Sequence, residues 1–381
     1  MGKRISAFLF CLLFCFLSLS SFAADFTSEI DCRSAILMEA STGKVLFEKN
    51  ADEALPPASV TKIMTLLLIC EAVDDKVITL DDMVSTSERA ASMGGSQVYL
   101  KVGEELSVRD MVKCVVIASA NDCAVALAEY LCGSESAFVD KMNARAKELC
   151  MENTHFENTN GLDDTATNHV TSARDIAIMS RALISHPWIL EFSSTWLDSI
   201  RDGAFGLTNT NRLIRFYSGA NGLKTGSTSK AKFCISATAK REDMQLIAVV
   251  MAAPTRDTRN EIAKSLLDFG FSNYCIYHAD PVALQPLPVL RGQKTECALT
   301  VSPFSAILQK ERAAKVEYET ELSESLEAPI HAGDPVGEVV YSADGMEIGR
   351  APVFASEDVA KISYSDLFFA ILRKIVFESA K

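Results

Sequence analysis

The feature that most restricts the fold of this chain is an apolar segment that leaves a helix no polar face. Pro56-Pro57 breaks the chain, and the residues from Ser59 onward have helical character. The positions that follow Lys62 are almost all apolar: Ile63, Met64, Leu66, Leu67, Leu68 and Ile69. A helix that is apolar all round is buried. We therefore expect the helix that carries Ser59 and Lys62 to be surrounded by the rest of its domain.

Strand patterns lie on both sides of the helical part of the chain. Ala35–Glu39 and Val45–Glu48 predict a hairpin, and Phe233–Thr238 and Met244–Met251 predict a second strand pair. Further helices are predicted from Ser107 to about Ala118, from Asp122 on, over Val170–Ile184, and over Thr255–Phe269 with Gly270 as its C-terminal cap. Strands at both ends with helices between them indicate an α+β fold, an antiparallel sheet flanked by helices.

The pattern changes near Tyr274, where short strands and turns begin. We expect a first domain over residues 24–274, a small all-β domain over 275–360 and a C-terminal helix within 361–381. On a helical wheel this last segment has one broad apolar face: Phe368, Phe369, Ile371, Leu372, Ile375 and Val376. It is too short to span a bilayer, and an amphipathic helix is typical of a membrane-surface anchor. Packing back onto the β domain is the alternative.

Residues 1–23 have the pattern of a signal peptide. Lys3 and Arg4 precede an apolar run from Ala7 to Leu19, and small residues follow at Ser21-Phe22-Ala23. The alternative is a permanent anchor, although the run is shorter than the roughly 20 residues that span a bilayer. We expect an exported protein at the outer face of the cytoplasmic membrane.

Charge and cysteine content exclude several classes of function. The net charge of −13 makes nucleic acid an unfavourable partner. Eleven cysteines less Cys11 and Cys15 of the leader leave nine, without CxxC pairs or zinc-type spacing. We interpret most of them as free thiols in the core and expect neither a metal nor an organic cofactor.

Three short motifs carry the chemistry. Ser59 and Lys62 are three residues apart, so the hydroxyl and the amine lie on the same face of a helix, and burial makes such an amine a base. Ser119 and Asn121 fall on a turn between two predicted helices, where a hydroxyl can relay a proton and an amide can hold a peptide group.

The third motif is Lys224-Thr225-Gly226 on a predicted strand. Its cation and hydroxyl can bind a carboxylate, and its glycine permits a close approach of the backbone. Each motif alone is weak, because serine, asparagine and lysine are common in caps and loops.

In this order and spacing the motifs resemble the signature of penicillin-binding proteins and class A β-lactamases. The chain is similar in particular to the D-alanyl-D-alanine carboxypeptidases of the low-molecular-mass penicillin-binding family, from about Cys32 to Tyr274. The resemblance implies a serine peptidase that shortens peptidoglycan stem peptides and is acylated by β-lactams.

The resemblance also implies a role for each motif residue. Ser59 is the expected nucleophile, Lys62 its base and Ser119 the proton relay. Asn121 would orient the peptide amide. Lys224, Thr225 and Gly226 would hold the C-terminal end of the substrate peptide, which carries the free carboxylate. The backbone N–H groups of Ser59 and Ser227 would form the oxyanion hole.

Two departures from the family pattern and two competing functions remain. Lys232 stands where relatives commonly have glycine, and neither Arg212 nor Arg215 clearly matches an arginine that some relatives have before the third motif. A serine β-lactamase would share the acylation residues, but neither Glu152 nor Glu157 lies in a segment that resembles its deacylating loop. A non-catalytic penicillin sensor would not need an activated nucleophile.

Overall fold

The computed structural model describes residues 30–164 and 166–378, so the predicted leader lies outside the described residues. The chain divides into two compact units, one up to Ser272 and one from Asn273 on.

The first unit is built on a five-stranded sheet in which every neighbouring pair is antiparallel. The strand order is β2-β1-β9-β8-β7, so the N-terminal hairpin joins the C-terminal strands of the unit. The strands are β1 (Ser34–Glu39), β2 (Val45–Lys49), β7 (Ala220–Thr228), β8 (Lys232–Arg241) and β9 (Met244–Ala253). Both predicted strand pairs and the predicted α+β fold class are confirmed.

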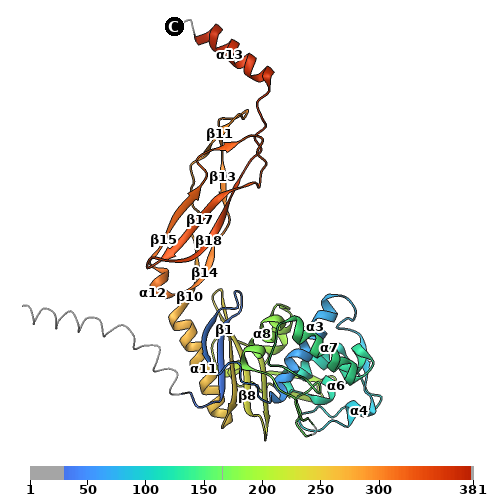
Figure 1. The fold of residues 1–381 in the computed structure, drawn as a ribbon. Coiled ribbons are helices and arrows are strands. Elements are labelled where there is room, and N and C mark those ends of the chain that lie inside the picture. Colours follow the sequence, from blue (N-terminus) through green and yellow to red (C-terminus); the bar gives the residue numbers. More distant parts are fainter. Residues whose placement is uncertain (1–29, 165, 379–381) are drawn as a thin grey trace, which may run out of the picture. The chain divides into compact units, whose positions relative to one another are not determined.

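The apolar helix is α3 (Lys62–Asp74), and ten of its residues are buried, from Lys62 to Ala72. It follows a 3₁₀ turn, η1 (Ala58–Thr61), so Ser59 lies in this turn and not in the α-helix itself. Helices α3 and α8 (Ala173–Ile184) cover one face of the sheet, and α11 (Arg256–Asn273) covers the other (Figure 1). The expectation that the apolar helix is surrounded is confirmed.

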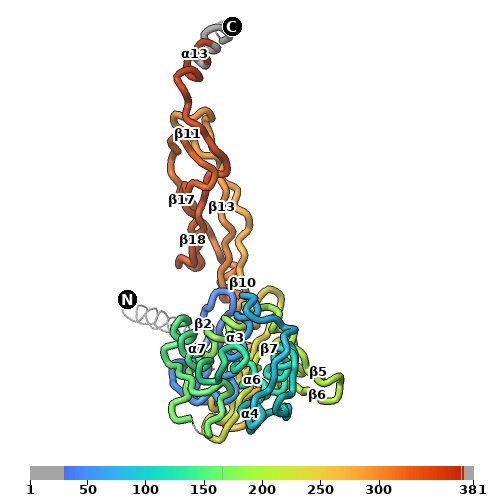
Figure 2. Tube along the Cα trace, turned by 90° about the vertical axis from the view of Figure 1, so that its right-hand side faces the viewer, coloured from blue at the N-terminus to red at the C-terminus, as the bar shows by residue number. Residues whose placement is uncertain are grey.

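The first unit contains further helices and strands beside the sheet and these helices. They are α4 (Glu88–Ala91), α5 (Val108–Lys113), the π turn η2 (Cys114–Ala118), α6 (Asn121–Cys132), α7 (Glu135–Glu148), α9 (Ile189–Ser193), α10 (Leu213–Phe216) and two short strand pairs, β3 (Met83–Ser85) with β4 (Glu105–Ser107) and β5 (Leu197–Ile200) with β6 (Phe205–Thr208). The β5–β6 hairpin projects from the edge of this unit (Figure 2).

Two predicted helix ends are wrong. Helix α11 does not end at Gly270 but continues to Asn273, and a Cβ on Gly270 would lie 2.5 Å from Leu246 Cδ1. This glycine therefore allows the helix to pack closely on the sheet and is not a cap. Helix α8 begins at Ala173, because Ser172 Oγ accepts the N–H of Asp175 and caps it.

The second unit is mostly β. Its main sheet has the order β13-β18-β17-β15, and smaller sheets pair β10 with β14 and β11 with β12 and β16. The strands of this unit are β10 (Tyr274–His278), β11 (Leu287–Leu290), β12 (Glu296–Cys297), β13 (Leu299–Val301), β14 (Ser305–Gln309), β15 (Val316–Leu322), β16 (Leu326–Glu327), β17 (Pro335–Ala343) and β18 (Met346–Ala355). An Asp344-Gly345 turn joins β17 to β18, with φ of 51° and 73°. One helical turn, α12 (Lys310–Ala313), interrupts the strands.

The chain continues into α13 (Tyr364–Glu378), in which Phe368, Phe369 and Ile371 are exposed. Within the described residues, no helix combines the length and the apolar character needed to cross a bilayer. No disulfide joins the nine cysteines of residues 30–378, and six of them are buried.

Candidate active site

The three sequence motifs meet at one pocket of about 170 Å³ in the first unit. Five of the predicted site residues line it: Ser59, Ser119, Thr225, Gly226 and Ser227. The other three, Lys62, Asn121 and Lys224, are buried and bond to residues of the motifs. The turn η1, the α5–α6 junction and strand β7 therefore bring all eight predicted residues together.

Lys62 is held by three oxygen atoms. Its Nζ lies 2.9 Å from Ser59 Oγ, 2.6 Å from Asn121 Oδ1 and 2.9 Å from the carbonyl oxygen of Asn160. The 3₁₀ turn places Ser59 and Lys62 in register, because side chains three residues apart eclipse each other in that helix. The predicted proximity of Ser59 Oγ and the Lys62 amine is confirmed.

Burial lowers the pKa of Lys62 well below its usual value, and the charge of Lys224 lowers it further, while Asp122 opposes the shift. The side chain is completely buried. Asp122 accepts the N–H groups of Val98 and Leu100 with Oδ2 at 3.1 Å each. The protein therefore favours a neutral amine beside the hydroxyl of Ser59.

Ser119 stands at a sharp change in the backbone. It follows the π turn η2 and has a φ of 63°, in the left-handed region that non-glycine residues rarely adopt. Its Oγ accepts a hydrogen bond from Lys224 Nζ at 2.8 Å, and Lys224 also donates to the carbonyl oxygen of Thr225. Such backbone outliers concentrate at functional sites.

Burial lowers the pKa of Lys224 to about 7, and Arg259 contributes to the shift. Gly226 explains how β7 reaches the nucleophile, because a Cβ there would lie 2.8 Å from both Pro57 O and Ser59 N. The third motif therefore packs directly on the turn that carries Ser59, as its glycine predicted.

Four further residues line the pocket that none of the sequence motifs indicated: Ser96, Thr210, Arg256 and Arg259. Arg259 is only 2% exposed, and burial, with Arg256 next in effect, lowers its pKa to about 10. The only signal for the two arginines was their position in the first turn of a helix that follows the last strand of the sheet. Their approach to Ser59 depends on the tertiary fold.

The structure shows the surroundings of the residues in both departures from the family pattern. Lys232 has a φ of 57° at the start of β8, the left-handed conformation that glycine adopts at little cost. Arg215 stacks over the rings of Trp196 and Phe216, with its Cζ 5.6 and 5.5 Å from their centroids. Arg212 is close enough to Arg259 to lower the pKa of its guanidinium.

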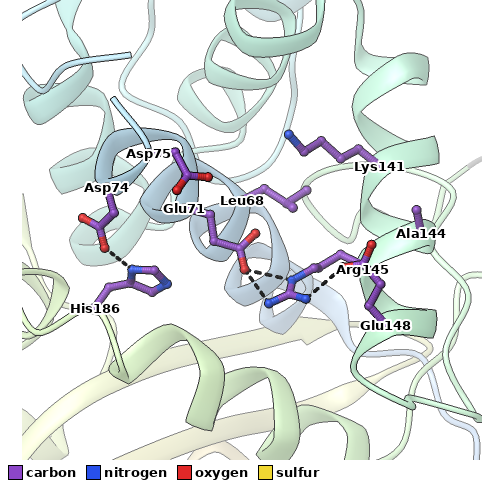
Figure 3. Close-up of a pocket in the computed structure, with 9 residues that line it drawn as sticks. All are labelled: Leu68, Glu71, Asp74, Asp75, Lys141, Ala144, Arg145, Glu148 and His186. Atoms are coloured by element: carbon purple, nitrogen blue, oxygen red, sulfur yellow. Dashed lines mark hydrogen bonds and ion pairs between the residues drawn. The ribbon is translucent and has the colours of Figure 1, made fainter. Parts of the chain in front are cut away.

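A second pocket, of about 380 Å³, lies at the opposite end of α3 (Figure 3). Most of its charged side chains pair with one another: Arg145 donates to Glu71 and Glu148, and Asp74 bonds to His186. None of the motif residues lines it. The chemistry therefore belongs to the pocket around Ser59.

Two protein-family models match the chain. Residues 21–255 match the family model described as D-alanyl-D-alanine carboxypeptidase, and residues 271–361 match the C-terminal domain of penicillin-binding protein 5. The D-alanyl-D-alanine carboxypeptidase DacF of Bacillus subtilis is 46% identical over 329 residues, which are 84% of each chain.

Two solved structures are similar to the chain. Penicillin-binding protein 5 of Haemophilus influenzae has a TM-score of 0.75 and 31% identity, over 87% of this chain and 98% of that one. Penicillin-binding protein D2 of Listeria monocytogenes, in an ampicillin-bound form, has a TM-score of 0.59 and 33% identity, over 64% of this chain and 98% of that one.

Proposed function

The chain belongs to the D-alanyl-D-alanine carboxypeptidase family of serine peptidases, and we propose that it shortens peptidoglycan stem pentapeptides through an acyl-enzyme on Ser59. The observation that carries this proposal is the set of contacts around Lys62. A neutral amine has two N–H donors and one lone pair. Asn121 Oδ1 and the Asn160 carbonyl accept the two N–H groups, which leaves the lone pair for the hydroxyl proton of Ser59.

Acylation and deacylation then follow from these contacts. Ser59 Oγ attacks the carbonyl carbon of the penultimate D-alanine, and its proton passes to Lys62 Nζ. The N–H groups of Ser59 and Ser227 stabilise the oxyanion. When the peptide bond breaks, the hydroxyl of Ser119 gives its proton to the leaving amine of the terminal D-alanine, and the proton held by Lys62 restores that hydroxyl. Water then attacks the ester, its oxygen stays on the shortened peptide, and its proton passes by way of Lys62 to Ser59 Oγ, which restores the free enzyme.

The substrate's terminal carboxylate meets a group of cations. Lys224 and Thr225 bind it in this proposal, and Arg259 adds a further positive charge at the pocket wall. Asn121 has its Nδ2 on Gly94 O and its Oδ1 on Lys62, so its first role is to hold the base. Orientation of the substrate amide by Asn121 remains part of the proposal.

A β-lactam would react in the same way, since its strained amide presents a carbonyl carbon to Ser59 and its carboxylate to Lys224. We place the reaction outside the cytoplasmic membrane, with residues 1–23 as the export signal and residues 24–274 as the catalytic domain. Residues 275–360 would form the β domain. Helix α13 would lie in the membrane surface, supported by its exposed Phe368, Phe369 and Ile371.

The test is release of D-alanine from a diacylated L-Lys-D-Ala-D-Ala peptide, with and without penicillin. We expect release that penicillin abolishes, and neither release nor covalent penicillin labelling in Ser59→Ala. Labelling of a different serine, located by peptide mass mapping, would contradict the assignment. Labelling with no D-alanine release from any such peptide would indicate a penicillin sensor.

A further inference from the structure

Two loops position the two oxygen acceptors of Lys62, Asn160 O and Asn121 Oδ1. The first comprises residues 158–162 and presents the carbonyl oxygen of Asn160 at 2.9 Å from Lys62 Nζ. The second comprises residues 92–96, where Gly94 O accepts Asn121 Nδ2 at 2.7 Å. This bond orients the Asn121 amide so that Oδ1 faces Lys62. The position of the Lys62 amine therefore depends on both loops.

The 158–162 loop is tightly shaped and lies against the nucleophile's turn. Asn158 Oδ1 accepts the N–H of Gly161 at 2.7 Å, and Asn158 Nδ2 donates to Leu162 O at 2.8 Å. A Cβ on Gly161 would lie only 1.8 Å from Ala58 O, and Gly161 has a φ of 83°. The loop therefore leaves no space between itself and η1.

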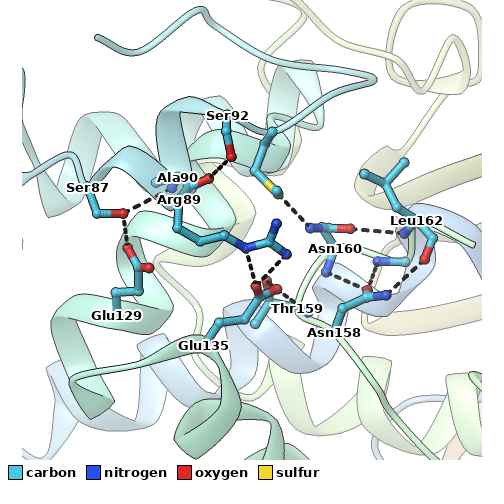
Figure 4. Close-up of polar contacts among 12 residues, drawn as sticks. Ser87, Arg89, Ala90, Ser92, Glu129, Glu135, Asn158, Thr159, Asn160 and Leu162 are labelled. Atoms are coloured by element: carbon cyan, nitrogen blue, oxygen red, sulfur yellow. Dashed lines mark hydrogen bonds and ion pairs between the residues drawn. The ribbon is translucent and has the colours of Figure 1, made fainter. Parts of the chain in front are cut away.

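Glu135, the first residue of α7, connects the two loops (Figure 4). Its Oε1 accepts Thr159 Oγ1 at 3.0 Å and Thr159 N at 3.4 Å. Its Oε2 accepts Arg89 Nε at 3.2 Å and Nη2 at 3.0 Å. Arg89 lies in α4, directly before the 92–96 loop, and Asn160 Nδ2 contacts Met93 Sδ at 3.6 Å.

We propose that Glu135 is a positioning residue of the reaction, which fixes both oxygen acceptors of Lys62 by binding Thr159 and Arg89 at once. Its side chain is 14% exposed, so the ion pair with Arg89 is partly shielded from water. The proposal rests on the function of Lys62 as the base. Glu135 itself touches neither the pocket nor Ser59.

The expected signature is a change in the pH profile of acylation. If the loops loosen, water reaches the Lys62 amine and its pKa rises towards its usual value. A rise of one unit in the pKa of Lys62 lowers the neutral fraction of its amine about tenfold at any pH below both the old and the new pKa. The other charges near Lys62 are those of Lys224 on β7 and Asp122 on α6, and a substitution of Glu135 leaves both residues in place.

One more titratable group packs beside this site. His169 Nδ1 accepts the N–H of Glu157 at 3.0 Å, and its Nε2 lies 2.8 Å from Thr61 Oγ1. Burial lowers the pKa of His169 to about 4, so it is neutral over the range in which acylation is measured. It therefore contributes no change of charge to the acid side of the profile.

The experiment measures the second-order rate of acylation by a fluorescent penicillin between pH 5 and 10 for the full mature chain. The variants are Glu135→Ala and the near-isosteric Thr159→Val, which removes only the hydroxyl that bonds to Glu135. The matched control is Glu129→Ala. Glu129 Oε2 accepts Ser87 Oγ at 2.6 Å and so supports α4 from another side, with no bond to Thr159.

We expect both variants to move the acid limb to higher pH by about one unit, with a roughly tenfold loss of the acylation rate at pH values below both acid limbs, which alkaline pH restores. Glu129→Ala should keep the wild-type profile. A lower melting temperature with an unshifted acid limb in Thr159→Val would overturn the proposal, as would an equal shift in Glu129→Ala. If Glu135→Ala does not fold, Thr159→Val decides. Absence of any acid limb in the wild type would instead contradict Lys62 as the base.

Discussion

Lys224 Nζ lies 2.8 Å from Ser119 Oγ, so the expected carboxylate anchor is bonded to the expected proton relay. The ammonium of Lys224 must leave or share this bond when a substrate carboxylate arrives. In the proposed mechanism, proton transfer to the leaving group and recognition of the free carboxyl terminus would therefore be coupled in one contact.

Lys224→Gln should reduce kcat/KM for peptides with a free terminal carboxylate, because a charge-assisted contact is lost. The reduction should correspond to a loss of about 2–4 kcal/mol in the free energy of transition-state binding. Steady-state D-alanine release measures the effect. The control is Lys230→Gln, since Lys230 donates only to Asp163 O at the surface. Unchanged kcat/KM in Lys224→Gln would show that the carboxylate binds elsewhere, with Arg259 as the first candidate.

The pKa of Lys224 also predicts how substrate binding depends on pH. With a pKa of about 7, the side chain is a cation below that pH and becomes neutral above it. The KM for a free-acid peptide should therefore rise as the pH increases through about 7, and this rise should vanish in Lys224→Gln. A KM that increases equally in both proteins would assign the titration to a different group.

Lys62→Arg should be as damaging as Lys62→Ala, with a loss of roughly a thousandfold or more in the acylation rate. A guanidinium does not release its proton at working pH, so it cannot accept the proton of Ser59. Penicillin labelling rates of the three proteins provide the measurement. Substantial labelling of Lys62→Arg would mean that a different group takes this proton.

Lys232→Gly should raise the free energy of unfolding by up to about 1 kcal/mol, because glycine adopts the left-handed conformation without the cost of a Cβ. Denaturant unfolding of the wild type and the variant tests this. The control is Lys240→Gly in the same strand, where φ is not positive and glycine should destabilise. Destabilisation by both changes would contradict the interpretation of Lys232.

Ending the chain at Ile362 removes α13 and should leave a folded protein that reacts with penicillin and does not sediment with membranes. The full mature chain should sediment with them, because the exposed apolar residues of α13 would lie in the membrane surface. Flotation with lipid vesicles and a labelling assay measure both properties. A full chain that stays free of vesicles, or a truncated chain that misfolds, would indicate that α13 packs on protein.

The sequence alone determined the features that depend on near neighbours. The missing polar face of α3 predicted its burial, alternation and turn residues predicted the hairpins, and the three-residue spacing predicted the contact of Ser59 with Lys62. These patterns act within one or two turns of chain. They are therefore visible without knowledge of what packs against them.

Only the tertiary structure decided which distant groups share the site. Asn160 reaches Lys62 from 98 residues away, Lys224 reaches Ser119 from 105, and the approach of Arg259 and the bond from Glu135 to Thr159 have no local pattern. Gly270 was misread for the same reason, since a glycine near a helix end predicts a cap unless the side chain of Leu246 occupies the space of its Cβ. Such contacts depend on how sheet and helices pack, which no short stretch of sequence specifies.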